Sequence, residues 1–179
     1  MHATPKTKYD AVAMSLHWLI AALIIFMLFF GEGLMKASRS GDVLSPSLHA
    51  SIGISILILS VFRLVWRFMN PPPPYPVSMT LWERMASKAV VLIFYLLLIG
   101  IPLTGWLAMP HFLSEEPAMT GISVFGLFPL PSAPSLGLPM RSVHELGSNL
   151  TIAIIVLHVL AALKHHFINR DEILRRMLP

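Results

Sequence analysis

The chain has 179 residues, of which 55% are hydrophobic and only 12% are charged, and its formal net charge is +4. This composition excludes an ordinary soluble protein and is typical of a small integral membrane protein, with a single domain over residues 1–179. The chain contains no cysteine, which excludes a covalently attached c-type haem, a cysteine-ligated iron–sulfur cluster and any disulfide.

Four stretches are apolar enough and long enough to cross a bilayer, which takes about 20 residues. We expect an all-α, integral membrane four-helix bundle with spans at about residues 13–30, 47–66, 89–109 and 144–166. The first span carries no Asp, Glu, Lys or Arg. It is too long for the apolar part of a signal peptide, and no small-residue cleavage pattern precedes Lys36, so we expect it to be retained.

The later spans are separated by proline-rich connections. The second span continues past Arg63 to Trp66, where the arginine and the tryptophan mark the membrane edge. A run of prolines between residues 69 and 78 predicts an extended polyproline connection to the third span. The longest loop, residues 110–141, is rich in proline but also apolar, so we expect it to fold over the helix ends.

Basic residues are distributed unequally between the two ends of these spans. Of the 13 basic residues, only Lys36, Arg39 and Arg141 fall on one side. By the positive-inside rule, the opposite side, which includes both termini, is expected to face the cytoplasm. The positive charge therefore indicates topology and contact with membrane lipid, and no nucleic-acid partner is expected.

Eight histidines are the main indication of function in so apolar a chain, because polar residues within spans are costly and usually functional. His144 and His158 are 14 residues apart, so they share one face of the fourth span and differ by about 21 Å in depth. His49 is expected near the outer depth of His144, and His17 near the inner depth of His158. The sequence therefore predicts two pairs, His17 with His158 and His49 with His144.

Paired neutral imidazoles on facing helices suit the two axial positions of a haem iron, and two such irons suit electron transfer across a membrane. In the alternative, a haemless helical scaffold, each histidine only forms a hydrogen bond between helices, worth about 1 kcal/mol. Transport of zinc or copper is a further alternative, although no acidic residue within the spans completes a path for a hard cation. Arg63 and Arg141 are candidates to neutralise haem propionates or, alternatively, charges that only set the topology.

Several short motifs surround these residues. They are Ser15-Leu16-His17-Trp18, Leu48-His49-Ala50-Ser51-Ile52-Gly53, Arg63-Leu64 with Arg67, Tyr95 through Pro102-Leu103-Thr104-Gly105, His144-Glu145, and His158 through Ala161-Ala162-Leu163-Lys164-His165-His166. With these motifs the chain resembles the bacterial cytochrome b561 family over nearly its full length. The chain departs from that pattern at Val91, where relatives often have a histidine and where a proton route would be altered, and at Val143, where they often have a tryptophan. Neither departure removes a ligand.

The resemblance implies that two haem b groups are ligated by His17 with His158 and by His49 with His144, which agrees with the pairing expected from depth. It also implies an inner-membrane oxidoreductase that exchanges electrons with ubiquinone and, in the best-understood members, oxidises superoxide at the outer face. The implied quinone pocket includes the position of His165, which is chemically suited to hydrogen-bond a quinone and to pass a proton. The other interpretation of His165 is an interfacial histidine solvated by lipid headgroups.

Superoxide is the expected electron donor. Lys36, Arg39 and Arg141 flank the spans that carry the outer histidine pair, so they are candidates for a positive patch that attracts a small anion. Acidic residues outnumber them on the same side, so such a patch requires that the two signs of charge be segregated. The alternative function is an electron-transfer subunit that accepts electrons from a periplasmic dehydrogenase or a c-type cytochrome.

Overall fold

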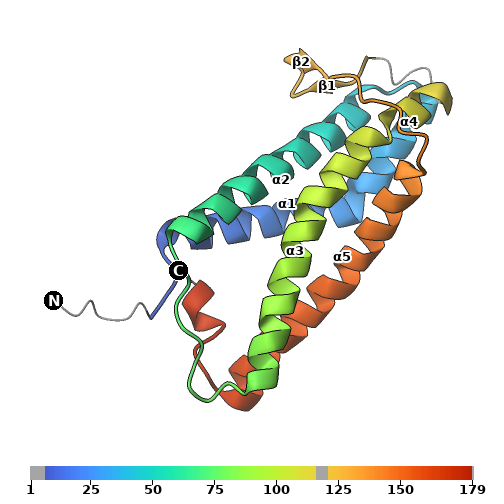
Figure 1. Ribbon diagram of the computed structural model, residues 1–179. Coiled ribbons are helices and arrows are strands. Elements are labelled where there is room, and N and C mark those ends of the chain that lie inside the picture. Colours follow the sequence, from blue (N-terminus) through green and yellow to red (C-terminus); the bar gives the residue numbers. More distant parts are fainter. Residues whose placement is uncertain (1–6, 116–120, 179) are drawn as a thin grey trace.

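The structure of the protein is a computed structural model that describes residues 7–115 and 121–178, so residues 1–6, 116–120 and 179 of the expected domain lie outside the described part. Four long helices form the bundle: α1 (Ala11–Lys36), α2 (Leu44–Met69), α3 (Leu81–Leu107) and α5 (Met140–Leu163) (Figure 1). By length and composition, all four can cross a membrane. The predicted all-α membrane bundle is therefore confirmed.

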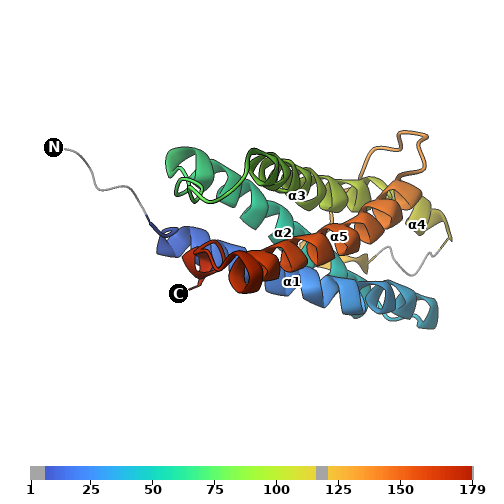
Figure 2. The same cartoon turned by 90° about the horizontal axis from the view of Figure 1, so that it is seen from below.

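The helices pack mainly as α1 on α2, α2 on α3 and α3 on α5 (Figure 2). A small core forms where Ile20 and Ile24 of α1 meet Ile56 of α2 and Leu98 of α3. Even in the best-packed helix only 17% of the most apolar window is buried inside the protein. Most apolar side chains thus face outward, an arrangement that is stable against lipid but not against water.

The start of α1, the segment that follows α5 and the loop between α2 and α3 lie at one end of the bundle (Figure 1). Trp18 Nε1 donates a hydrogen bond to the carbonyl oxygen of Met177 (2.9 Å), and the guanidinium of Arg176 donates to the carbonyl oxygen of Pro74. Trp66 Nε1 donates to Asp10 Oδ1 (2.9 Å). These bonds tie the N-terminal, proline-rich and C-terminal segments together. The assignment of this end to the cytoplasm stays a prediction from the basic residues.

The described part of the long loop packs on the opposite end of the bundle through Ile122 and Leu130. The other apolar residues on which this expectation rested do not pack there, because Phe125, Leu127 and Phe128 are exposed. The loop contains a short helix, α4 (Met109–Glu115), and a small antiparallel hairpin of β1 (Ser123–Val124) and β2 (Phe128–Pro129). The hairpin is fixed to α2, because Ser47 Oγ accepts a hydrogen bond from the amide of Ser123 (3.1 Å) and Ser51 Oγ accepts one from the amide of Phe125 (2.7 Å).

The bounds of all four long helices differ from the expected spans, and two of these differences have a clear local cause. Helix α3 begins at Leu81, well before residue 89, because Thr80 and Glu83 form a capping box at its N-terminus. The expected span began later because it was predicted from the apolar stretch alone, and the first turns of α3 contain polar residues. At the other boundary, the chain after Leu163 forms a π-helical turn, Lys164–Asn169. Regular α-helical spacing therefore ends at Leu163, before His165.

Candidate functional site

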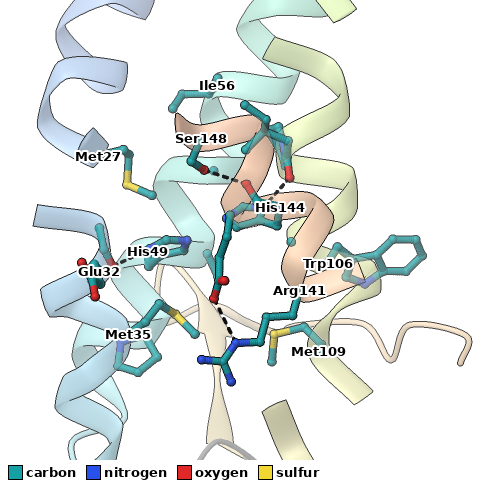
Figure 3. Close-up of a pocket in the computed structure, with 18 of the residues that line it drawn as sticks. Met27, Glu32, Met35, His49, Ile56, Trp106, Met109, Arg141, His144 and Ser148 are labelled. Atoms are coloured by element: carbon teal, nitrogen blue, oxygen red, sulfur yellow. Dashed lines mark hydrogen bonds and ion pairs between the residues drawn. The ribbon is translucent and has the colours of Figure 1, made fainter. Parts of the chain in front are cut away.

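The outer histidine pair joins two helices across a cavity. His49 of α2 and His144 of α5 have ring centres 6.2 Å apart with an angle of 52° between the ring planes. Both rings line a cavity of about 730 Å³ (Figure 3), a volume within the range of about 300–1,000 Å³ that is usual for cofactor pockets. The structure thus brings together two residues that lie far apart in the sequence and whose rings face a common space.

Each outer histidine is oriented by a backbone carbonyl group. Nδ1 of His49 lies 3.0 Å from the carbonyl oxygen of Gly31, and Nδ1 of His144 lies 2.8 Å from that of Ile101. A carbonyl oxygen can only accept, so Nδ1 carries the ring proton in both residues. The lone pair of each neutral imidazole is then on Nε2, which is the usual arrangement of a metal-binding histidine.

A glycine of α3 allows the His144 ring to lie close to the backbone of that helix. A Cβ atom at Gly105 would lie 2.8 Å from Cε1 and 2.9 Å from Nδ1 of the His144 ring. No larger residue fits there unless the ring moves away from the carbonyl oxygen of Ile101. Gly105 therefore shapes the outer site by leaving room for the His144 ring.

The inner pair has the same spacing. His17 of α1 and His158 of α5 have ring centres 6.2 Å apart with an angle of 65° between the planes. The ring of Phe94 of α3 meets His158 edge-on at 5.3 Å, and Trp18 meets His17 in the same way at 5.2 Å. The inner pair is therefore held among aromatic side chains of the bundle.

Arg63 contacts the inner pair directly. Its Nη1 lies 3.0 Å from Nδ1 of His17, and because a guanidinium only donates, Nδ1 is the acceptor and the ring proton is on Nε2. A metal ion at Nε2 requires the other tautomer, so Arg63 must leave Nδ1 before His17 can act as a ligand. The inner site thus matches the outer one in the spacing of its rings. It differs in that Nδ1 of His17 accepts a hydrogen bond, whereas Nδ1 of each outer histidine donates one.

The spacing of both pairs fits an axially ligated iron. A bond between imidazole nitrogen and a first-row metal is about 2 Å long, and the nitrogen lies about 1 Å from its ring centre, so two rings on opposite sides of one metal have centres about 6 Å apart. Within residues 7–115 and 121–178, no group of three or more His, Asp or Glu side chains is placed to hold a metal ion. Two-histidine sites suit a metal whose other donors come from a macrocycle.

At the mouth of the outer cavity, the expected positive patch is not formed by Lys36 and Arg141. Arg141 donates to Glu145 (3.0 Å) and to Glu115 (3.0 Å), and its guanidinium lies over the ring of Phe112 at 5.2 Å. Lys36 forms an ion pair with Glu32, one turn earlier in α1. The segregation of charge that such a patch requires is therefore absent at these two residues, because acids one turn away or across the loop are near enough to pair with them.

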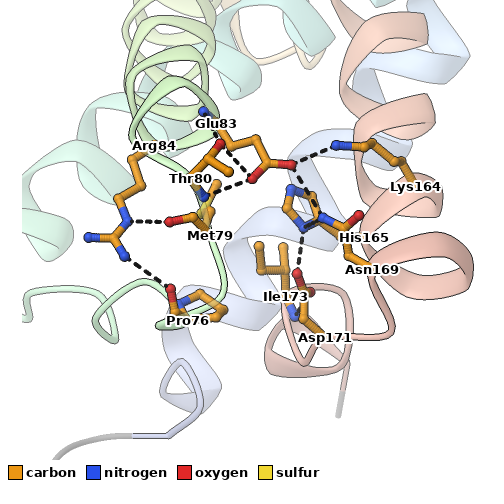
Figure 4. Close-up of polar contacts among 10 residues, drawn as sticks. All are labelled: Pro76, Met79, Thr80, Glu83, Arg84, Lys164, His165, Asn169, Asp171 and Ile173. Carbon is orange, nitrogen blue, oxygen red and sulfur yellow. Dashed lines mark hydrogen bonds and ion pairs between the residues drawn. The ribbon is translucent and has the colours of Figure 1, made fainter.

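His165 lies in a polar network at the other end of the bundle (Figure 4). Its Nδ1 is 2.6 Å from Oδ2 of Asp171, and the two side chains are only 8% and 7% exposed. Asn169 connects this pair to Glu83, which also accepts a hydrogen bond from Lys164 (2.6 Å). The interpretation of His165 as a histidine solvated by headgroups is therefore wrong.

Asp171 is a site residue that the sequence did not indicate. The residue follows the π-helical turn, and Arg170 before it has a left-handed backbone (φ 53°) that turns the chain back toward His165. Nδ1 of His165 also lies 3.2 Å from the amide nitrogen of Asn169. The shorter, charge-assisted contact with Asp171 decides that Nδ1 carries the proton, so Nε2 of His165 is the nitrogen that remains to bind another group.

Comparison with known proteins gives consistent matches. The family profile described as "Prokaryotic cytochrome b561" matches residues 8–179. The chain is 34% identical to "Cytochrome b561 homolog 2" of Escherichia coli (strain K12), over 98% of this chain and 93% of that protein. It is 32% identical to "Probable superoxide oxidase CybB" of Yersinia pestis, over 96% of each, and 25% identical to "Cytochrome b562" of Cereibacter sphaeroides, over 98% of each.

Proposed function

Since the chain belongs to the prokaryotic cytochrome b561 family and is thus a bacterial haem b protein of membrane electron transfer, we propose that it holds two haem groups and carries electrons from superoxide to ubiquinone. The observation that carries this proposal is the spacing of 6.2 Å between ring centres in both histidine pairs. In this proposal the protein lies in the inner membrane with both termini in the cytoplasm.

His49 and His144 hold one haem b, and His17 and His158 hold the other. When bound, each haem b would supply a one-electron couple, which suits electron transfer without binding of oxygen. The protein contributes the orientation of the ligands, through the carbonyl groups of Gly31 and Ile101 at the outer site. It also contributes a mainly apolar lining to the outer cavity.

Arg63 is the proposed propionate partner at the inner site. Its contact with Nδ1 of His17 shows that the guanidinium reaches this site. Because Nδ1 must donate when Nε2 binds a metal, the guanidinium has to release the ring, and a carboxylate is then its natural partner. In this role Arg63 binds and positions the cofactor. Its positive charge favours the reduced state, and the carboxylate that it binds weakens this effect.

The overall reaction balances two one-electron oxidations with one two-electron reduction. Two superoxide anions each lose one electron at the outer face and become two molecules of O₂. Ubiquinone takes up these two electrons and two protons and becomes ubiquinol. We place the quinone at Nε2 of His165, which is oriented for this contact by the bond from Nδ1 to Asp171, and this histidine passes a proton to the quinone oxygen.

The relative from Yersinia pestis that is named a probable superoxide oxidase supports superoxide as the donor. The paired charges at the outer face favour the second candidate, a donor protein. Arg141 is held by Glu115 and Glu145, so little unpaired positive charge from this residue is available to attract an anion. A periplasmic dehydrogenase or c-type cytochrome with a basic surface would instead fit acidic residues at this face.

Stopped-flow absorbance of the purified protein distinguishes the two donors. Mixing the oxidised protein with superoxide and then with a short-chain ubiquinone should give rapid haem reduction and then one quinol for every two superoxide anions consumed. Superoxide dismutase added before mixing should abolish both signals. Haem reduction that is slow with superoxide, at every salt concentration, would reject superoxide and favour the protein donor.

A further inference from the structure

A second cavity lies between α2 and α3, toward the loop that joins these two helices. Its volume is about 450 Å³. Leu64 and Phe68 of α2 and Leu92 of α3 form apolar walls, and Arg67 and Lys88 also line it. Figure 1 shows that α2 and α3 diverge toward the loop that joins them, and the cavity lies in this part of the bundle. None of these residues belongs to the histidine sites.

The two cations of this cavity have no acidic partner within the described part of the chain, whereas several other basic residues at the same end do have partners. Lys164 pairs with Glu83, and Arg175 pairs with Glu172. Arg84 donates to the carbonyl oxygens of Met79 and Pro76. The cations of the α2–α3 cavity are therefore available to an anion that comes from outside the protein.

The apolar walls of the cavity indicate that such an anion would come from the membrane. Phe68 is 78% exposed and Leu92 is 61% exposed, and both lie on helices whose outward faces are apolar. Apolar side chains this exposed are stable only against lipid tails. A molecule that places an anionic group between Arg67 and Lys88 and apolar chains along Phe68 and Leu92 would satisfy both parts of the cavity.

We propose that the α2–α3 cavity binds an anionic phospholipid, with the phosphate between Arg67 and Lys88 and the acyl chains along the two helices. Basic pockets between membrane helices bind such headgroups, and the planar guanidinium of Arg67 can hold a phosphate through two hydrogen bonds. A neutral quinone would leave both cations unpaired. A soluble phosphate would leave the apolar walls uncovered.

Native mass spectrometry of the haem-loaded protein tests this proposal with phosphatidylglycerol and phosphatidylethanolamine as probes. We expect wild-type protein to retain phosphatidylglycerol and to bind phosphatidylethanolamine more weakly. Each cation near a membrane surface strengthens binding of an anionic lipid about fivefold, so Arg67→Gln with Lys88→Gln should weaken phosphatidylglycerol binding about thirtyfold. Inorganic phosphate at millimolar concentration should not displace the lipid.

Lys8→Gln is the matched control, since Lys8 is exposed in the N-terminal segment and does not line the cavity. It should bind phosphatidylglycerol as the wild type does, and the haem content of all variants should stay unchanged, which separates this proposal from the proposed function. Equal lipid binding by the double variant, equal loss in Lys8→Gln, or displacement by inorganic phosphate would each overturn it.

Discussion

The imidazole of His144 lies so close to the backbone of Gly105 that a Cβ atom there would be 2.8 Å from Cε1 of the ring. The hydrogen bond from His144 to the carbonyl oxygen of Ile101, one turn earlier in α3, depends on this approach. The position of the His144 ring thus depends on two α3 residues, Ile101 and Gly105, neither of which is a ligand in our proposal.

Replacing Gly105 by alanine should therefore remove the outer haem, because the added methyl group displaces the His144 ring. The haem content measured by the pyridine haemochrome assay should fall from two to one per chain, while the circular dichroism spectrum stays that of a helical protein. Gly100→Ala is the matched control, since a Cβ atom at Gly100 meets nothing within 4 Å. Two haems in Gly105→Ala, with an unchanged absorbance spectrum, would contradict this role.

The ligand assignment predicts a pairwise pattern of haem loss. His49→Ala and His144→Ala should each remove the outer haem, and His17→Ala and His158→Ala should each remove the inner one. Because one imidazole of a pair cannot hold both axial positions, the two variants of a pair should share one reduced-minus-oxidised difference spectrum. His111→Ala, on α4 and outside both pairs, should keep two haems. Four different spectra, or a wild-type chain with a single haem, would refute the assignment.

Asp171→Asn should slow reduction of ubiquinone about tenfold, because the loss of a carboxylate that orients a functional histidine costs about 10- to 100-fold. Haem reduction by the electron donor should be unchanged, since Asp171 contacts His165 and not the haem ligands. The neutral side chain still accepts the hydrogen bond from the amide of Ile173, which preserves the local fold.

Glu172→Gln, an exposed neighbouring acid that pairs with Arg175, is the control for this experiment and should behave as the wild type. His165→Ala should slow quinone reduction at least as much as Asp171→Asn, with both haems retained. If neither variant alters the rate of quinone reduction, the quinone does not bind at His165.

The ion pairs at the outer mouth predict the effect of charge on the reaction with superoxide. Glu115→Gln and Glu145→Gln should each raise the rate at low salt, because they release Arg141 from a partner. One unit charge at 10 Å in water is worth about 0.4 kcal/mol, which corresponds to about a twofold change. The gain should vanish at high salt, where the Debye length is about 3 Å at 1 M.

Glu32→Gln removes the partner of Lys36. It should also raise the rate at low salt if Lys36, like Arg141, lies near the path of the anion. Stopped-flow traces at several salt concentrations measure all three variants. Rates that do not respond to either the variants or the salt would show that no small anion is attracted to this face, as expected for a protein donor.

The sequence by itself determined the quantities that depend on distance along a helix. A bilayer of fixed thickness requires about 20 apolar residues per span, and a regular helix rises 1.5 Å per residue. The number of spans and the expected depths of His17, His49, His144 and His158 followed from these constants, and the structure brings together the residues expected at equal depth. The resemblance to the family rests on the same residues.

Only the tertiary structure decided what lies beside each of these residues. Ile101 and His144 are 43 positions apart, and Glu115 and Arg141 are 26 apart, so the direction in which two helices or a loop present their side chains determines both contacts. Asp171 reaches His165 because a π-helical turn and a left-handed residue reverse the chain. None of these contacts follows from the apolar pattern, because that pattern only indicates which residues face lipid. The contacts themselves arise from lateral packing of the helices and from local backbone geometry.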